Sequence, residues 1–273
     1  MLRQRVITAG VLLAVALPTL FAAAPWLFAA LALLLMAGAF WEWGKLNGLR
    51  SRASAVTAAL LCVAAWWVVR PLPADPVGVG VVAWLWLLAL IAGLRWGPSH
   101  WWRVAPIWRL GGGWLLLLAS WWSLLQLHQR GPAFLVSVLT IAWVADSLAY
   151  GGGRLWGKRK LAPRISPGKT WEGVACGAVG VCLWAWAWLA CFDPEGQWGP
   201  TVYAYAAEQG VAWALLVWLG LAAVTVMGDL FESMVKRGAG VKDASALLPG
   251  HGGVLDRLDA LLPLMPVALW LVL

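Results

Sequence analysis

Long apolar runs follow one another along almost the whole of this sequence. A helix that crosses a bilayer needs about 20 mostly apolar residues, and nine runs approach that length: about 6–23, 25–42, 54–70, 77–94, 111–127, 132–150, 172–191, 209–229 and 256–273. Hydrophobic residues make up 62% of the chain and charged residues only 12%, whereas about 25% of an ordinary soluble domain is charged. The pattern predicts an all-α, polytopic integral membrane protein with about nine transmembrane helices.

No soluble domain, long linker or obvious repeat separates these runs. We therefore expect a single membrane domain over residues 1–273, with N-terminal spans over about 1–130. Arg3, Arg5 and the stretch FAAAP make the first run resemble a signal peptide. Another apolar run, from Trp26 to Phe40, follows at once, and this favours a retained helical hairpin. The four cysteines lack metal-binding spacing and are expected to be small buried residues.

Lys and Arg are distributed unevenly between the loops. Cytoplasmic loops of membrane proteins carry an excess of both residues. If the N-terminus is cytoplasmic, 18 of the 20 Lys and Arg residues lie on that side, and only Arg70 and Arg130 lie on the other. The loop FDPEGQWGPTVYAYAAEQG, at 192–210, then lies outside and carries only acids. The sequence thus predicts a multi-pass protein of the cell (inner) membrane with a cytoplasmic N-terminus.

The net charge of +8 favours contact with the lipid bilayer through anionic headgroups, or with phosphates. It does not favour nucleic acid, because the basic residues sit in short loops between apolar runs and not on one polar face.

Two carboxylates lie at membrane depth, Asp146 in WVADSLAY and Asp229 in VMGDLFES. A carboxylate there costs about 2.5–3.5 kcal/mol on insertion scales, so each is a candidate functional residue. The plain alternative is that each pairs with a nearby Lys or Arg at the interface.

The stretch VKRGAGVKDASALLPGHGGVLDRLDALLPLMP, at 235–266, concentrates both signs of charge before the last apolar run. If the eighth span continues as a helix, one face carries four polar residues: Asp229, Ser233, Lys236 and Arg237. Asp256 and Asp259 share a face as well. Carboxylates from separate helices, with a hydroxyl, form an oxygen site that suits Mg²⁺. The surrounding cations are expected if a polyphosphate lies between them and the metal.

Two glycine-containing motifs accompany these charges. The turn PGHGG permits close backbone approach and can direct N–H groups at an anion, with His251 near phosphate or base, although a plain helix connector is an equal alternative. The stretch SPGKTWEG, at 166–173, is not a P-loop, because Pro163 stands where the first glycine belongs and no preceding strand is expected. Lys169 remains a candidate phosphate contact, which Glu172 would cap or orient.

A pattern of 27 residues without a gap now stands out. Ser233-x-x-Lys236-Arg237, Lys242-Asp243, Pro249-x-His251-Gly252-Gly253 and Asp256-Arg257-x-Asp259 resemble the signature of phosphatidate cytidylyltransferases, also called CDP-diacylglycerol synthases. ADSLAYGGGRLWGKRKLAPRISPGKTWEG, at 145–173, and GDLFES, at 228–233, resemble that family too. The N-terminal half resembles it only as apolar spans.

The resemblance implies transfer of CMP from CTP to phosphatidic acid at the cytoplasmic face, with Mg²⁺, by a C-terminal catalytic part over about 131–273. It implies metal ligands chiefly at Asp229 and Asp256, with Ser233 nearby, and K⁺ as a candidate second cation. Asp146 and Asp259 complete the candidate metal set, and Asp229, Asp256, Lys236 and Arg237 the catalytic set. The candidate substrate-binding residues are Lys169, Ser233, Lys242, Asp243, His251, Gly252, Gly253 and Arg257.

Three other functions stay open on sequence alone. The chain could be a cation-coupled lipid transporter using Asp146 and Asp229, but the first five runs carry almost no polar residues for such a path. It could be a membrane cytidylyltransferase for another lipid phosphate. It could also be a metal-dependent scaffold without turnover. A homodimer is likewise an open alternative to a monomer.

Overall fold

The computed structural model describes residue 10 and residues 14–192 and 196–273. Seven of the described helices are long and apolar enough to cross a membrane. They are α2 (Pro25–Leu46), α3 with its π-helical end (Ser51–Val69), α4 (Pro76–Trp96), α6 with a π-helical start (Trp108–Gln129), α7 (Pro132–Trp156), α8 with a π-helical end (Trp171–Phe192) and α10 (Val211–Gly238). They confirm an all-α membrane architecture and correspond to seven of the nine predicted spans.

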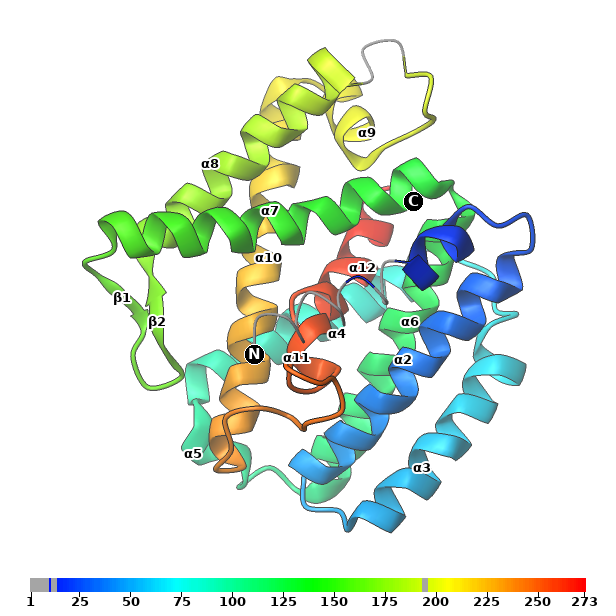
Figure 1. Cartoon of the computed structure of the whole chain (residues 1–273), viewed down its shortest axis with the longest axis vertical. Helices are drawn as coiled ribbons and strands as arrows, with labels where there is room; N and C mark the ends of the chain where they lie inside the picture. Colours follow the sequence, from blue (N-terminus) through cyan, green and yellow to red (C-terminus); the bar gives the residue numbers. More distant parts are fainter. Residues whose placement is uncertain (1–9, 11–13, 193–195) are drawn as a thin grey trace.

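The predicted first span, 6–23, is described in part: residues 14–20 are helical, whereas residues 6–9 and 11–13 lie outside the described residues. The choice between signal peptide and retained hairpin stays a prediction. Four further helices are short: α5 (Pro98–Trp101), α9 (Val202–Glu208), α11 (Leu255–Leu258) and α12 (Leu261–Trp270). Figure 1 shows α12 among α4, α6, α7 and α10, and α9 at the end of the molecule away from α11.

Local sequence sets several helix boundaries. Helices α2, α4, α5 and α7 each begin with proline, whose fixed φ suits the first helical turn and whose missing N–H is not needed there. Between α6 and α7, Gly131 has a φ of 115°, which permits the sharp reversal. Helices α7 and α10 run to Trp156 and Gly238, beyond the ends predicted near 150 and 229. Because α10 continues to Gly238, Asp229, Ser233, Lys236 and Arg237 lie on one helix, as the predicted shared polar face requires.

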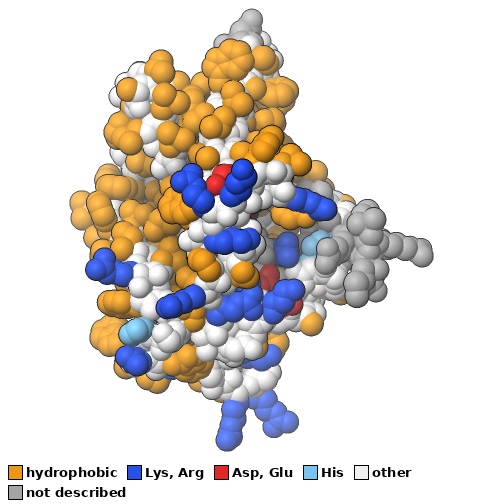
Figure 2. Space-filling model, turned by 90° about the vertical axis from the view of Figure 1, so that its left-hand side faces the viewer, with side chains coloured by type: hydrophobic (Ala, Val, Ile, Leu, Met, Phe, Trp, Pro, Cys, Tyr) orange, Lys and Arg blue, Asp and Glu red, His pale blue; other side chains and the backbone are white. Residues whose placement is uncertain are grey.

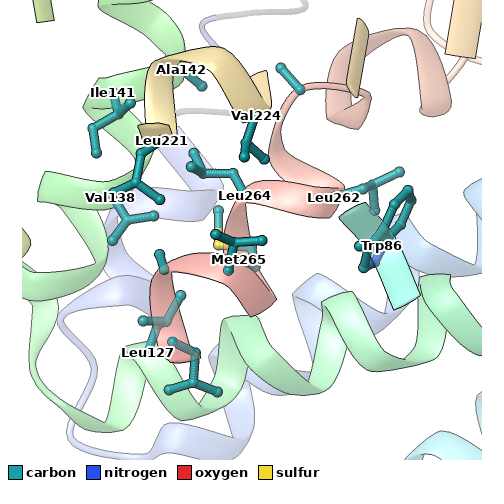
Figure 3. Close-up of a cluster of buried hydrophobic side chains, with 14 of the residues drawn as sticks. Trp86, Leu127, Val138, Ile141, Ala142, Leu221, Val224, Leu262, Leu264 and Met265 are labelled. Carbon is teal, nitrogen blue, oxygen red and sulfur yellow. The ribbon is translucent and has the colours of Figure 1, made fainter. Parts of the chain in front are cut away.

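The predicted ninth span, 256–273, is not confirmed as a spanning helix. The segment forms only α11 and the ten-residue α12, and a helix of ten residues is about 15 Å long, half of a hydrocarbon core of about 30 Å. Leu262 to Leu269 are all buried inside the protein. Figure 3 shows Leu264 and Met265 among Val138 and Ile141 of α7 and Leu221 of α10. The apolar run reflects burial in protein and not contact with lipid.

A proline inside α12 leaves one carbonyl of that helix without a backbone donor, and a side-chain hydroxyl replaces the donor. Pro266 has no N–H to donate to the Leu262 carbonyl one turn earlier. The hydroxyl of the buried Ser120, on α6, donates to that carbonyl at 2.6 Å. Side-chain hydroxyls commonly satisfy backbone groups freed by proline in membrane proteins. This bond ties α12 to α6.

The exception to an all-α fold is a β-hairpin between α7 and α8. Strands β1 (Lys160–Ala162) and β2 (Ser166–Thr170) pair antiparallel, Lys160 with Thr170 and Ala162 with Ser166. The expectation that no strand precedes this stretch was wrong, because β1 ends directly before Pro163, and Gly-Lys-Thr itself forms the end of β2. Thr170 caps α8 by accepting a hydrogen bond from the Gly173 N–H at 3.2 Å.

The outer faces of the helices are apolar. Large exposed hydrophobic side chains occur along α3, α4, α8 and α10, among them Leu60, Trp84, Leu183 and Leu216. Figure 2 shows hydrophobic side chains around a central group of Lys and Arg. An apolar surface of this extent fits contact with lipid tails, as expected for a multi-pass membrane protein.

Candidate active site

A polar cavity of about 690 Å³ lies where α7, β2, α10 and the α11 segment meet. Its volume is within the usual range of ligand pockets, roughly 300–1,000 Å³. Its charged lining residues are Asp146, Arg154, Lys169, Asp229, Asp256, Arg257 and Asp259. Figure 2 shows acidic side chains set between Lys and Arg on this side of the molecule. Residues from the stretch 145–173 and from the stretch 228–259 therefore line the same cavity.

Three carboxylates from separate elements form its acidic wall: Asp146, Asp229 and Asp259. Lys169 of β2 lies 2.6 Å from Asp229 Oδ2, and the Ser233 hydroxyl donates to Asp229 Oδ1 at 3.3 Å. Burial, and then the negative charges of Asp229 and Asp146, raise the pKa of Asp259 well above its ordinary value. The wall thus has an excess of negative charge that one lysine partly balances.

These carboxylates suit a Mg²⁺ ion, although the protein alone does not enclose one. Their oxygens are hard ligands. Burial is the main cause of the raised pKa of Asp259, and repulsion from Asp229 and Asp146 adds to it; a cation would relieve the repulsion. Among the described residues, no three His, Cys, Asp or Glu side chains are grouped closely enough to hold a metal by themselves. Mg²⁺ is usually held by one or two carboxylates together with substrate phosphates, and the wall fits that arrangement.

Asp256 lines the cavity but is engaged by the protein. Its Oδ1 lies 2.5 Å from Lys236 Nζ, and its Oδ2 accepts the N–H groups of Ala244 at 2.9 Å and Gly253 at 2.7 Å. Burial opposes ionisation, but these partners keep the pKa of Asp256 below its ordinary value. A metal bound to Asp256 would therefore share this carboxylate with Lys236 and two backbone N–H groups.

Lys236 is buried between two carboxylates. Its ammonium lies 2.5 Å from Glu232 Oε2 and 2.5 Å from Asp256 Oδ1. We did not predict Glu232, although a Glu four residues before a Lys on one helix is a recognisable pairing. In this structure Lys236 joins α10 to α11, and its predicted contact with phosphate remains a prediction.

Arg237 does not line the polar cavity. Its guanidinium donates to the Ile165 carbonyl in the hairpin at 3.4 Å and to the Val241 carbonyl at 3.3 Å. Arg237 therefore links the end of α10 to the hairpin that carries Lys169.

Five predicted substrate-binding residues line a second polar cavity of about 610 Å³. Lys242, Asp243, His251, Gly252 and Arg257 line it. Arg257 also lines the first cavity, and its Nε donates to the His251 carbonyl at 3.1 Å. Asp243 forms no ion pair within the described part of the chain. The signature residues thus divide between two adjacent cavities and positions outside both, the latter being Ser233, Lys236, Arg237 and Gly253.

The PGHGG turn contacts negatively charged groups, and these are carboxylate side chains of the protein itself. Gly252 has a φ of 84°, and a Cβ there would lie 2.9 Å from Asp256 Oδ2. A Cβ on Gly253 would lie 2.6 Å from a carboxylate oxygen of Glu42. Both glycines therefore let carboxylates approach the backbone closely.

Glu172 does not orient Lys169, contrary to expectation. Its carboxylate accepts the N–H groups of Lys158 and Arg159, at 3.1 Å each, and pairs with Arg159 Nε at 3.2 Å. It closes the base of the hairpin, whereas Lys169 reaches Asp229.

Two features from the N-terminal half were not predicted. Glu42 of α2 is fully buried and accepts hydrogen bonds from Val254 and Leu255 N–H groups. An acid within the apolar run at WEWGK was the available signal. An apolar cavity of about 230 Å³ also adjoins the polar one and shares Asp259 with it; its aromatic lining includes Trp43, Trp86, Trp96, Trp101, Trp108 and Phe231.

Comparison with known proteins shows the family of the chain. A family model described as the cytidylyltransferase family matches residues 3–273. The chain is 40% identical to a phosphatidate cytidylyltransferase from Pseudomonas aeruginosa, over 98% of this chain and 95% of that protein. It is 33% identical to one from Haemophilus influenzae, over 97% and 96%. Because these matches run along almost the full length, including the segments around both polar cavities, the chain belongs to the cytidylyltransferase family.

Proposed function

We propose that this enzyme is a phosphatidate cytidylyltransferase, which transfers CMP from CTP to phosphatidic acid and yields CDP-diacylglycerol and pyrophosphate. Relatives with that name match along nearly the entire chain. The structural observation that carries the proposal is the junction of a charged cavity with an apolar one at Asp259. An amphiphilic substrate needs such a junction, with its phosphate on the polar side and its lipid part on the apolar side.

The reaction needs no covalent intermediate on the protein. The phosphate of phosphatidic acid is anionic near neutral pH, since the second pKa of a phosphate monoester is about 6. One of its oxygens bonds to the α-phosphorus of CTP, the bond from that phosphorus to the bridging oxygen breaks, and pyrophosphate leaves with the electron pair. Within the described residues, no activated Ser or Cys nucleophile lies among the side chains around the polar cavity.

The chain's own residues align two anions and balance their charge. Lys169, Arg154 and Arg257 line the cavity and would stabilise the charge that develops on pyrophosphate. Asp229 and Asp259, with Asp146 nearby, would hold Mg²⁺, which supplies Lewis-acid polarisation of the α-phosphate when bound. Asp256 is a further candidate ligand, and K⁺ a candidate for a second cation position.

We further propose that the enzyme lies in the inner membrane with its N-terminus and both polar cavities cytoplasmic, where CTP is available. Support comes from the 18 of 20 Lys and Arg residues that this orientation places inside.

An acceptor panel tests the function. Purified enzyme with Mg²⁺ and CTP is mixed with phosphatidic acid, with diacylglycerol that lacks the phosphate, or with an isoprenoid phosphate. We expect pyrophosphate release only with phosphatidic acid. Equal or faster release with the isoprenoid phosphate would replace the proposed substrate, and release without any lipid would indicate a CTP hydrolase.

A further inference from the structure

A buried carboxylate in the N-terminal half holds the segment that carries part of the polar cavity. Glu42 is fully buried on α2. Its Oε1 accepts the Val254 N–H at 2.9 Å, and its Oε2 accepts the Leu255 N–H at 2.7 Å. The Ser245 hydroxyl donates to Oε1 at 2.5 Å. Within the described part of the chain Glu42 forms no ion pair, so these three donors are what offsets the cost of burying its charge.

The backbone around Glu42 is shaped for this contact. A Cβ on Gly253 would lie 2.6 Å from Glu42 Oε1. A Cβ on Gly38, one turn before Glu42, would lie 2.8 Å from a methyl carbon of Val254. Side chains at either glycine would push α2 and the turn apart. The absence of both side chains lets α2 and the turn pack closely enough for direct hydrogen bonds.

Glu42 and Asp256 together bind three successive backbone donors. Asp256 takes the Gly253 N–H, and Glu42 takes the next two, those of Val254 and Leu255. These residues lead directly into α11 (Leu255–Leu258). The position of α11 in turn sets where Arg257 and Asp259 enter the polar cavity.

We propose that Glu42 is a positioning residue, which fixes the start of α11 and thereby holds Arg257 and Asp259 in place for the reaction. The inference rests on the proposed function, but its structural part can be tested without it. Glu42 lines neither polar cavity, so it would act through the backbone and not on substrate.

Glu42→Gln is the informative variant because it keeps the size of the side chain. Gln offers one oxygen, and its NH₂ group cannot accept, so one of the two backbone N–H groups loses its partner. We expect faster backbone amide exchange at Val254 or Leu255, measured by mass spectrometry on the wild-type and variant proteins. We also expect a kcat lower by about 10–100-fold, the range for partners that orient ligands from outside a site, and a higher Mg²⁺ concentration for half-maximal rate.

Ser137→Ala is the matched control. Ser137 is also fully buried and accepts a backbone N–H, that of Val202 at the start of α9, at 3.0 Å. Figure 1 places α9 far from α11. This variant should lose thermal stability, but its kcat and Mg²⁺ dependence should stay within about twofold of wild type, as expected for a remote cap. Ser245→Ala, which removes only one donor to Glu42, is a milder variant and should change exchange and kcat in the direction of Glu42→Gln.

The outcomes separate the inference from the proposed function. Unchanged amide exchange near Val254 in Glu42→Gln would overturn the inference, whatever the activity. Faster exchange with a kcat no lower than in Ser137→Ala would reduce Glu42 to a purely structural role and also overturn it. If Glu42→Gln does not fold, Ser245→Ala decides by the same two measurements. If the wild type makes no CDP-diacylglycerol, the proposed function fails, and amide exchange alone still tests whether Glu42 holds α11.

Discussion

The acids near the polar cavity differ in what they contact. Asp146, Asp229 and Asp259 face the cavity, whereas Glu42 and Glu172 accept backbone N–H groups outside it. Asp256 does both. A substitution in the first group should change chemistry with little loss of fold, and one in the second should change backbone position.

Asp229→Asn tests the first group. Removal of the charge takes away a candidate metal ligand and the partner of Lys169. We expect kcat/KM to fall by about 100-fold or more, as when a charged group that stabilises the transition state is lost, with normal membrane insertion. Asp75→Asn is the control, since Asp75 is an exposed helix cap on α4 and Asn caps equally well. Rates for Asp229→Asn within a few-fold of the control would contradict the metal assignment.

Lys236→Met tests the buried ion pairs. The variant leaves Glu232 and Asp256 without their cation inside the protein. Loss of one partner of a buried pair typically costs about 3–5 kcal/mol, so the detergent-solubilised variant should unfold at a clearly lower temperature. Lys160→Met, in the exposed hairpin, should unfold like the wild type. Equal stability of the two variants would show that Lys236 is not needed to balance these acids.

At the scale of helices, one backbone carbonyl of α12 is satisfied by a side-chain hydroxyl from α6. Ser120 donates to the Leu262 carbonyl that Pro266 leaves without a helical partner. Ser120→Ala should lower the free energy of unfolding by about 1–3 kcal/mol, because a buried carbonyl becomes unsatisfied.

Ser123, three residues further along α6, provides a close control. It is fully buried, and no described residue forms a hydrogen bond with its hydroxyl. Ser123→Ala should therefore leave stability in thermal unfolding unchanged or slightly raised. A loss in Ser123→Ala equal to that in Ser120→Ala would mean that the hydrogen bond to Leu262 contributes nothing.

The sequence predicted the elements whose signal is local. The apolar runs predicted nine spans, and seven of them match helices long enough to cross a membrane. Helical spacing placed Asp229 and Ser233 within hydrogen-bonding distance. It could not distinguish α12 from a span, since an apolar run has the same composition whether protein or lipid covers it. Glu42 escaped prediction because its partners are backbone N–H groups more than 200 positions away, and no side-chain pattern marks them.

For the molecule as a whole, the predicted orientation in the membrane can be tested by cysteine labelling. Single cysteines at Ala246 and Gln209, both exposed, are introduced into a protein whose four native cysteines are replaced. Because the Lys and Arg distribution puts Ala246 in the cytoplasm, an impermeant thiol reagent applied to intact inner-membrane spheroplasts should label Gln209→Cys and not Ala246→Cys. The reverse labelling would place both polar cavities on the wrong side for CTP.

The most direct test of the proposed function is to measure transfer of the CMP group from CTP to lipid. Purified wild-type protein in vesicles is given phosphatidic acid, Mg²⁺ and CTP labelled at the α-phosphorus, and the organic-phase label and released pyrophosphate are followed together. We predict that label enters lipid in step with pyrophosphate release, and that Asp229→Asn loses both in parallel. Pyrophosphate release while the label stays in water-soluble CMP, or no turnover in the wild type, would contradict the account.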